Sequence, residues 1–315
     1  MGLRFTVLAS GSGGNATLLE ADGFGVLIDA GLGPRQLARR LAAAGRSWAD
    51  VRAVLLTHTH SDHWRDRTFA LLHRYRIPLY CHLDHHRGLH AYAPTFPTLL
   101  AADLVRPFEP GQEIALAPNL RCQALPVRHD GGATFGFRLE GGATNLFGDT
   151  ASVGYVADLG TWDLALAERL ANVDLLAVEF NHDVAMEHAS GRSSLLIARV
   201  LGDHGHLSNA QASEFVQAVL QRSEAGRLRH LVQLHLSREC NRPLLAREAA
   251  RAVLALMQAD AALHTAKQDE PLPTLTLGEA NGDRSRRRAA PRRSPRPGPA
   301  AQPWLPGFEV GDAAP

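Results

Sequence analysis

Four side chains that bind cations well lie within six consecutive positions, 58–63, which read HTHSDH. His58 and His60 are one residue apart, so their two imidazoles can reach a single cation from a tight loop. The carboxylate of Asp62 and the imidazole of His63 can face a second cation, and borderline cations such as zinc accept this mixture of ligands. A histidine-rich surface loop is the alternative, but this spacing directly after an apolar strand disfavours it. The segment therefore predicts a metal site.

Four more residues with metal-binding side chains stand at the ends of apolar segments, at Asp29, His129, Asp149 and His235. Taken singly, each is a weak signal, because a lone histidine is more often a structural residue than a ligand. Their order along the chain and their shared position at strand ends make coincidence improbable. What joins them to the same site is the family resemblance described below.

The elements that must position these residues are short strands and amphipathic helices. The segment Val51–Thr57 reads as a buried strand that ends directly on the histidines, and Gln112–Gly142 alternates enough for three or four antiparallel strands. Further strands are expected at 5–9, 16–20, 25–29, 77–81, 144–148, 175–180 and 228–236, and helices at 34–44, 68–75, 164–171, 193–201, 209–221 and 244–262.

The histidine segment resembles the metal-binding motif of the metallo-β-lactamase fold, whose other motifs follow here in the family's order. The resemblance implies that Asp29 orients the histidine loop without binding metal. It also implies that Asp149, in Phe147-Gly148-Asp149-Thr150, bridges the two metals. The ligand set carried over is His58, His60 and His129 for a first ion and Asp62, His63, Asp149 and His235 for a second.

Four further segments are similar to the YycJ-like (WalJ-like) branch of that fold: 9–15, 181–183, 205–209 and 235–243. The resemblance covers about residues 3–260 and implies 5′-to-3′ exonuclease activity on DNA. It implies an αβ/βα four-layer sandwich, in which two mixed β-sheets lie face to face with helices outside. The metal site is then expected at one edge of the sheets.

The expected chemistry is hydrolysis of a phosphodiester with two divalent ions, zinc or alternatively manganese, that activate a shared water. We assign Asp62 and His206 to catalysis, with His206 as the proton donor to the leaving group. The alternative for His206 is a residue at a helix entry, and Glu179 or Glu187 could then carry the proton. The residues expected to support the site are Asp29, Asn181, His182, Asp183, Ser208 and Asn209.

The composition constrains the competing functions. The formal net charge is +1, no apolar run is long enough to cross a membrane, and three scattered cysteines suit a reducing cytoplasm. A small-molecule phosphodiesterase and a non-catalytic binding protein remain the alternatives to a DNA exonuclease. The turn 11–15 fits a loose dinucleotide fingerprint, but a strand is expected after it, which disfavours NAD.

Arginines are the sequence feature that bears on a nucleic-acid partner, because a nuclease needs a basic groove that follows the phosphates. Several arginines lie close to the motif loops, but the sequence does not show whether they converge. They are Arg35, Arg39, Arg40, Arg65, Arg67, Arg74, Arg87, Arg192, Arg238 and Arg242. A second histidine cluster, at His85, His86 and His90, is interpreted as a surface group.

The chain is expected to divide into a hydrolase domain, 1–265, and a disordered Pro- and Arg-rich tail, 266–315. The arginine run 284–296 contains no acidic residue, so we expect it to bind DNA phosphates non-specifically. The apolar patch 302–308 either folds back on the domain or binds a protein partner.

Overall fold

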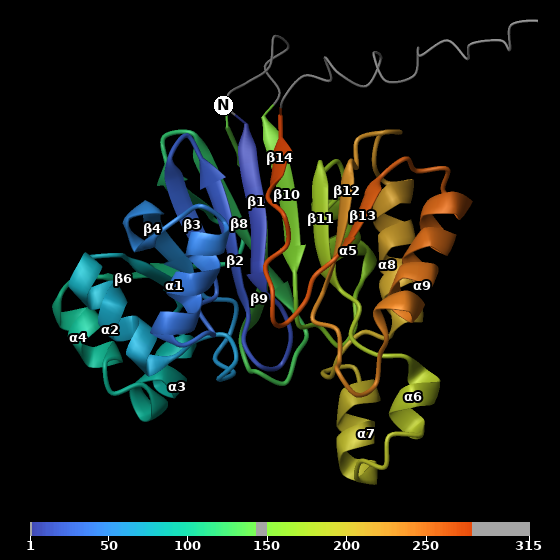
Figure 1. Ribbon diagram of the computed structural model, residues 1–315, viewed down its shortest axis with the longest axis horizontal. Coiled ribbons are helices and arrows are strands. Elements are labelled where there is room, and N and C mark those ends of the chain that lie inside the picture. Colours follow the sequence, from blue (N-terminus) through green and yellow to red (C-terminus); the bar gives the residue numbers. More distant parts are fainter. Residues whose placement is uncertain (1, 143–149, 279–315) are drawn as a thin grey trace, which may run out of the picture. The chain divides into compact units, whose positions relative to one another are not determined.

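Two β-sheets of seven strands each pack face to face in this computed structural model, which describes residues 2–142 and 150–278 (Figure 1). Side chains from the facing sides of both sheets form one apolar core, which includes Phe5, Phe137 and Tyr155. Helices cover the outer faces, and each layer packs on its sheet through a separate apolar cluster. The predicted four-layer sandwich of two mixed sheets is confirmed.

The first sheet has the strand order β14-β1-β2-β3-β4-β5-β6. Pairing is antiparallel from β14 to β3 and parallel from β3 to β6. Every residue of β2 is buried, as expected for a strand that is covered on both faces. The strands span Leu3–Ala9 (β1), Ala16–Ala21 (β2), Phe24–Ile28 (β3), Val51–Leu55 (β4), Leu79–His82 (β5), Val105–Phe108 (β6) and Leu275–Leu277 (β14).

The second sheet has the strand order β13-β12-β11-β10-β9-β8-β7. Pairing is antiparallel from β7 to β10 and parallel from β10 to β13. The strands span Glu113–Ala117 (β7), Leu120–Val127 (β8), Thr134–Gly141 (β9), Ala151–Val156 (β10), Leu175–Glu179 (β11), His230–Leu234 (β12) and Ala262–Thr265 (β13).

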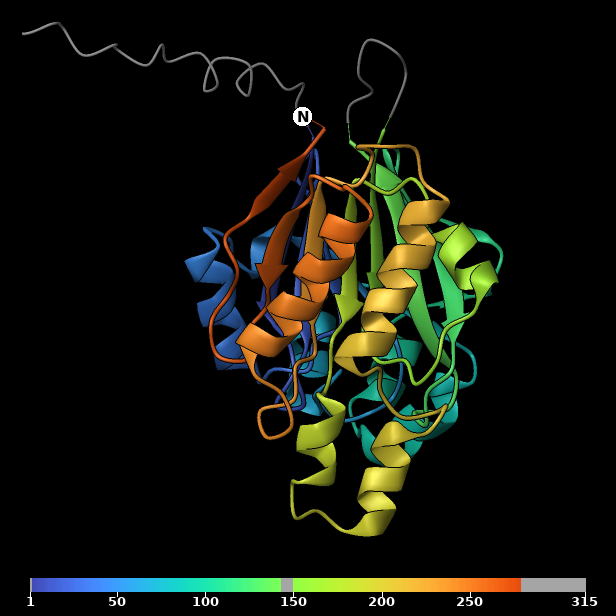
Figure 2. The same ribbon diagram turned by 90° about the vertical axis from the view of Figure 1, so that its right-hand side faces the viewer.

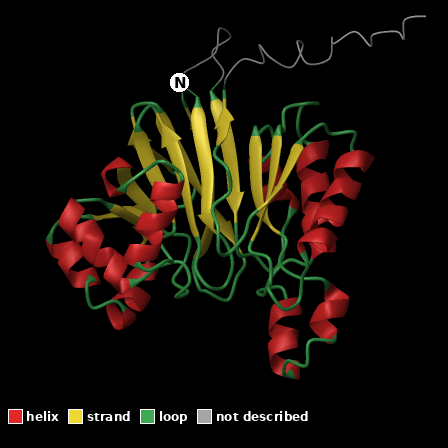
Figure 3. Cartoon of the chain, in the orientation of Figure 1, coloured by secondary structure: helices red, strands yellow, loops and turns green. Residues whose placement is uncertain are grey.

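The helices lie outside the sheets (Figure 3). The helices α1, α2, α3 and α4 pack on the first sheet, and α5, α8 and α9 pack on the second. Figure 2 shows α6 and α7 beyond the ends of the strands. The helices span Pro34–Ala43 (α1), Asp66–Tyr75 (α2), His85–Tyr92 (α3), Phe96–Ala101 (α4), Leu164–Arg169 (α5), Val184–His188 (α6), Ser194–Leu201 (α7), Asn209–Gln221 (α8) and Pro243–Leu256 (α9), with a 3-10 turn at Trp48–Asp50.

The parallel strands explain why the candidate site residues gather at one edge. The strands β3 and β4 are parallel neighbours, and so are β10, β11 and β12. Because parallel neighbours end at the same edge of a sheet, the residues that follow them lie close together. Asp29 follows β3, His58 follows β4, Asp158 follows β10 and His235 follows β12.

One predicted element differs from the structure, and another falls on residues that the structure does not describe. The helix predicted at 244–262 ends at Leu256, because Gln258 adopts a positive φ of 52° and the chain then forms β13. The strand predicted at 144–148 lies outside the described residues, and the sequence interpretation did not include β10. No helix in the described ranges is long and apolar enough to cross a membrane.

The predicted boundary at 265/266 was wrong, because residues 266–278 belong to the sandwich. The backbone N–H of Leu272 donates to Val7, and β14 extends the first sheet by pairing with β1. Leu277 is 1% exposed and packs in the core between the sheets. Leu272, Leu275 and Leu277 lie near the end of this segment. The prediction missed them because it rested on the average composition of the whole Pro- and Arg-rich region. The part of the predicted tail from residue 279 on lies outside the described residues.

We predict that a chain ending at Thr265 is less stable than one ending at Gly278. The shorter chain loses the burial of Leu277 and the pairing of β14, which should lower the free energy of unfolding by at least about 2–3 kcal/mol. Urea unfolding of both truncated proteins measures the difference. Equal unfolding midpoints would contradict the assignment of residues 266–278 to the fold.

His85 corrects the interpretation of the second histidine cluster as a surface group. It lies at the start of α3 and is 1% exposed, and its Nε2 donates to the carbonyl of Ala133 at 2.8 Å. Burial lowers the pKa of His85 to about 4. The folded protein therefore holds this imidazole neutral at a pH where the unfolded chain protonates it.

This difference in pKa predicts a loss of stability as the pH falls from about 6.5 toward 4. Below the unfolded pKa the unfolded chain binds a proton that folded His85 does not, which corresponds to about 2 kcal/mol between pH 7.5 and pH 5. His85→Gln keeps a donor for Ala133 and removes the titration. The free energy of unfolding, measured with urea at pH 7.5 and pH 5, should therefore change less with pH in the variant, by about 2 kcal/mol. If the variant shows the same pH dependence as the unmodified protein, the lowered pKa of His85 is excluded.

Candidate metal centre

Three histidines, His58, His60 and His129, form the first group of candidate ligands. Nε2 of His129 lies 3.2 Å from Nδ1 of His60, and Nε2 of His58 is buried without a hydrogen-bond partner in the described parts of the chain. Nδ1 of His129 donates to the carbonyl of Gly205 at 2.9 Å, which leaves its Nε2 free. Two nitrogens bound to one tetrahedral zinc ion lie roughly 3.3 Å apart, so this spacing suits a single cation.

A second group contains Asp62, His63 and His235. Oδ2 of Asp62 lies 3.5 Å from Nε2 of His63 and 3.6 Å from Nε2 of His235. Nε2 of His235 is buried and has no hydrogen-bond partner within residues 2–142 and 150–278. The two imidazoles and the carboxylate therefore point at a common space next to the first group.

Asp158 lies where the two groups meet. Its Oδ2 is 2.9 Å from Nε2 of His63, and its Oδ1 is 2.9 Å from Nδ1 of His235. It also falls within reach of His58 and His63 as a third possible ligand. The predicted bridging residue, Asp149, lies outside the described residues. The carboxylate that the structure brings between the two groups is therefore Asp158.

The donor atoms of these residues fit divalent cations. Buried polar atoms almost always have hydrogen-bond partners, yet Nε2 of His58 and Nε2 of His235 have none among the described residues. Burial and the neighbouring His63 lower the pKa of His58. Burial raises the pKa of Asp158, but His235 and His63 outweigh it and hold the pKa well below its usual range. Deprotonated donors that lack partners are the state in which histidine and aspartate bind metals.

Asp29 forms a hydrogen bond with the ring nitrogen of His63 that faces away from Asp158, as predicted for a residue that orients the loop. Its Oδ2 accepts from Nδ1 of His63 at 2.7 Å, and its Oδ1 accepts from the backbone N–H of Thr57 at 2.9 Å. This contact fixes the tautomer of His63 and turns Nε2 toward Asp158. Burial of His63 favours its neutral form, but Asp29 and Asp158 outweigh it and raise its pKa.

Residues of the turn after β1 contact all three candidate ligands of the second group. The side-chain N–H of Asn15 lies 3.2 Å from Oδ2 of Asp62 and 3.0 Å from Nε2 of His63. Oγ of Ser10 accepts from the backbone N–H of His235 at 2.8 Å. Gln268 clamps this turn, since its Oε1 accepts from Gly13 N and its Nε2 donates to Gly14 O, both at 2.8 Å.

Glu179 and His206 form a pair at the edge of the centre. Nδ1 of His206 donates to Oε1 of Glu179 at 2.8 Å, and Nδ1 of His235 lies 3.0 Å from the same oxygen. Burial lowers the pKa of His206, but Glu179 outweighs it and raises the pKa. A cavity of about 360 Å³ opens beside His206 and His235, so this face of the centre is accessible. Glu187 is bound to Arg192 at 3.1 Å instead.

The predicted supporting residues divide into two kinds. Asn181 contacts the centre, because its Nδ2 donates to the carbonyl of His235 at 2.9 Å. Ser208 caps α8, and Asp183 caps α6, so their side chains serve helix ends. Asn209 exchanges two hydrogen bonds with Asn241, both at 3.0 Å. His182 is fully buried, and its two ring nitrogens have no hydrogen-bond partner in the described residues.

Sequence reasoning missed Asp158 and Asn15 and gave Glu179 only as an alternative. Asp158 stands just after the apolar strand Ala151–Val156, which the sequence interpretation did not include. Asn15 belongs to the recognised turn 9–15, yet nothing in its spacing shows that it reaches Asp62. These contacts join segments that are distant in the sequence.

Comparison of the sequence with known proteins identifies its relatives. The profile described as "Beta-lactamase superfamily domain" matches residues 25–226, more than half of the chain. The protein named exodeoxyribonuclease WalJ from Streptococcus pneumoniae is 30% identical over 243 residues, which cover 76% of this chain and 84% of the relative. Exodeoxyribonuclease YycJ from Bacillus anthracis is 28% identical over 249 residues, which cover 78% and 87%.

Solved structures show the same fold at lower identity. The metallo-β-lactamase fold protein YhfI from Bacillus subtilis has a TM-score of 0.60 and 18% identity, and the match covers 86% of this chain and 98% of that one. Zn²⁺-bound PqqB from Methylobacterium extorquens also has a TM-score of 0.60 and 18% identity, with coverage of 85% and 99%. These likenesses agree with the sandwich fold.

The family profile, the curated relatives and the converging histidines and aspartates lead to one assignment. The chain belongs to the beta-lactamase superfamily, as a metal-dependent hydrolase of the YycJ-like metallo-β-lactamase branch.

Proposed function

We propose that this hydrolase cleaves the phosphodiester bonds of DNA as a 5′-to-3′ exonuclease. The observation that carries the proposal is Asp158, whose carboxylate lies between two groups of candidate ligands and gives two cations a shared neighbour. A pair of adjacent cations suits in-line displacement at a phosphate. The names of the relatives from S. pneumoniae and B. anthracis support DNA as the substrate. The polarity rests on the resemblance to the branch.

The first cation would be held by the three histidines His58, His60 and His129. The second would be held by Asp62, His63 and His235, with Asp158 between the two. Zinc suits these nitrogen and oxygen donors, and manganese is the alternative. Bound divalent ions would supply charge stabilisation for the phosphate and a water of lowered pKa as nucleophile.

His206 is the residue that we assign as proton donor to the leaving oxygen. Glu179 accepts from its Nδ1, which fixes the ring and leaves Nε2 as the atom that can face substrate. The residue borders the cavity beside His235, so a substrate has access to it. Asp62, which we also assign to catalysis, would act by holding the second cation together with His63 and His235. The three cysteines are buried and free, which supports the cytoplasm as compartment.

The test of this function measures metal content and substrate choice together. We expect about two divalent ions per chain, and His60→Ala and Asp158→Asn should each lose metal and at least 100-fold in activity. End-labelled duplex DNA, single-stranded DNA, RNA and a cyclic phosphodiester are offered to the purified protein, and DNA should be degraded from its 5′ end.

Two matched variants serve as controls. His73 is exposed on α2, away from the centre, so His73→Ala should keep both metal and activity. Asp149→Asn should keep metal if Asp158 holds the bridging position. If Asp149→Asn loses metal and Asp158→Asn keeps it, Asp149 is the bridging residue instead. Hydrolysis of the cyclic phosphodiester alone would replace DNA by a small-molecule substrate.

The role of His206 predicts a defect that depends on the leaving group. His206→Ala should keep its metal and slow DNA cleavage by roughly 10²–10⁴-fold, as expected for loss of a general acid. The defect should shrink on bis(4-nitrophenyl) phosphate, because nitrophenolate leaves without a proton. Steady-state kinetics and metal analysis give both quantities. An equal defect on both substrates would show that His206 acts only as a structural residue at the entry to α8.

A further inference from the structure

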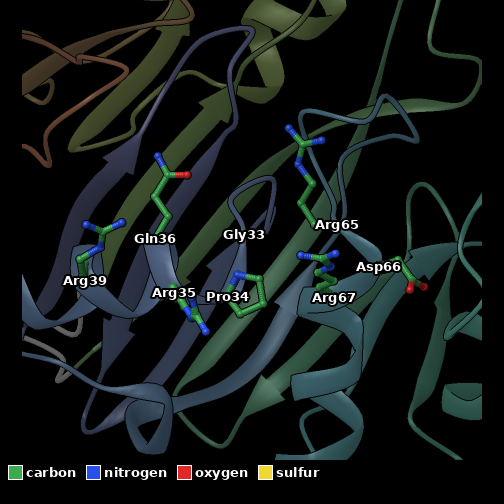
Figure 4. Close-up of a pocket in the computed structure, with 8 residues that line it drawn as sticks. All are labelled: Gly33, Pro34, Arg35, Gln36, Arg39, Arg65, Asp66 and Arg67. Carbon is green, nitrogen blue, oxygen red and sulfur yellow. The ribbon is translucent and has the colours of Figure 1, made fainter.

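A basic pocket lies at the beginnings of α1 and α2 (Figure 4). Its cavity volume is about 720 Å³, twice that of the cavity beside His206. Four of its eight lining residues are arginines, and they come from both helices and from the residue before α2. The lining consists of Gly33, Pro34, Arg35, Gln36, Arg39, Arg65, Asp66 and Arg67.

The charges of these arginines are not neutralised within the described residues. No carboxylate lies within ion-pairing distance of Arg35, Arg39, Arg65 or Arg67 in those parts of the chain. Asp66 contributes the single acidic side chain, but its Oδ1 accepts from the backbone N–H of Thr95 at 2.7 Å. In Figure 4 its carboxylate points away from the arginines. All four arginines are exposed, so a ligand can reach them.

The arginines beside the metal centre differ in this respect. Arg192 is bound to Glu187 and Glu239, and Arg199 is bound to Asp130. Such paired guanidinium groups are already neutralised. The basic pocket at α1 and α2 therefore offers unpaired positive charge, which the cavity beside His206 does not.

The pocket continues directly from the loops that build the metal centre. Gly33 lies four residues beyond Asp29, and Arg65 lies two residues beyond His63. Nε of Arg65 donates to the carbonyl of Gly31 at 2.9 Å, which joins the two loops. Because β3 and β4 are parallel, both loops leave the sheet at the edge that carries the candidate ligands.

The two helix beginnings favour the same kind of ligand. The helices α1 and α2 each have ten residues, and neither has a side chain that caps its first turn. Free N–H groups and the helix dipole place partial positive charge at these ends. Together with four guanidinium groups, which pair with phosphate oxygens through two parallel hydrogen bonds, they make the pocket complementary to a phosphate.

We propose that this basic pocket binds a phosphate of the DNA strand at a point removed from the bond that is cleaved. The proposal rests on the proposed function and deepens it, because it assigns the surface along which the strand is held. A polymer can occupy the metal centre and the pocket at once, whereas a small phosphodiester occupies one of them. The pocket therefore favours long substrates through affinity and does not take part in bond cleavage.

The test removes two of the four charges from different elements. Arg35→Gln/Arg67→Gln leaves the contact between Arg65 and Gly31 intact. For a single-stranded 12-nucleotide DNA we expect KM to rise about tenfold at low salt. The slope of log(kcat/KM) against log salt should become shallower by about 1–1.5, since each phosphate contact on a single strand contributes about 0.7. The defect should be several-fold smaller on bis(4-nitrophenyl) phosphate.

The control carries the same change of charge on the opposite helix layer. Arg247→Gln/Arg251→Gln alters two exposed arginines of α9, and it should keep the KM and salt slope of the unmodified protein. Metal content and the thermal midpoint of both variants verify that the fold is kept. If the pocket variant matches this control in KM and salt slope, the proposal is overturned.

Two further comparisons show which phosphate the pocket binds and whether a failure lies with the pocket proposal or with the proposed function. Strands with a 5′-phosphate and a 5′-hydroxyl are compared, because a pocket for the terminal phosphate gives the defect only on the first, whereas a backbone site gives it on both. The unmodified protein is assayed in parallel. If it does not cleave DNA at all, the proposed function fails, whereas normal cleavage by the pocket variant removes the pocket proposal alone.

Discussion

The buried hydrogen bond between Asp29 and His63 is the contact on which the centre depends. Asp29 is fully buried at a φ of 62°, a backbone region that few residues other than glycine adopt. Burial raises the pKa of its carboxyl against the influence of His63 and Thr57. A carboxylate in this position is tolerated because donors surround it. The same contact ties the end of β3 to the end of β4.

The hydrogen bond between Asp29 and His63 determines the geometry of the metal centre and of the two loops that lead away from it. Toward the centre, it turns Nε2 of His63 to Asp158. Away from the centre, the chain after Asp29 runs through Gly31, whose carbonyl receives Arg65. A side chain at Gly31 would collide with the carbonyl of Asp62, so the two loops approach as closely as backbone allows. Cation-binding groups and exposed arginines are thus positioned by one pair of loops.

The sequence predicted most of the fold and most of the candidate ligands that the structure brings together, for a physical reason. Metal-binding residues at the ends of apolar strands are local signals, and His58, His60 and Asp62 occupy one short loop. The sandwich followed from the family resemblance carried by that loop. Asp158 was missed because the strand before it, Ala151–Val156, was not predicted.

Contacts across long separations could not be predicted in the same way. Nothing local shows that Asn15 reaches Asp62, or that Gln268 holds the turn 11–15. The arginines near the motif loops were visible, but their convergence at α1 and α2 depends on the parallel pairing of β3 and β4. Composition also hid β14, since Leu275 and Leu277, in a polar region, form a strand only because β1 offers them an edge.

The clamp of Gln268 on the turn after β1 has a consequence for biosynthesis. The turn carries Ser10 and Asn15, which contact His235 and Asp62, and its Gly13 lies 255 residues before Gln268 in the chain. Its clamp, and the strand β14 that closes the first sheet, are among the last of the described segments. Domains begin to fold during synthesis, yet this sheet stays open at β1 until Leu277 has left the ribosome. While the nascent chain is still on the ribosome, the turn that contacts His235 and Asp62 therefore lacks the support of Gln268.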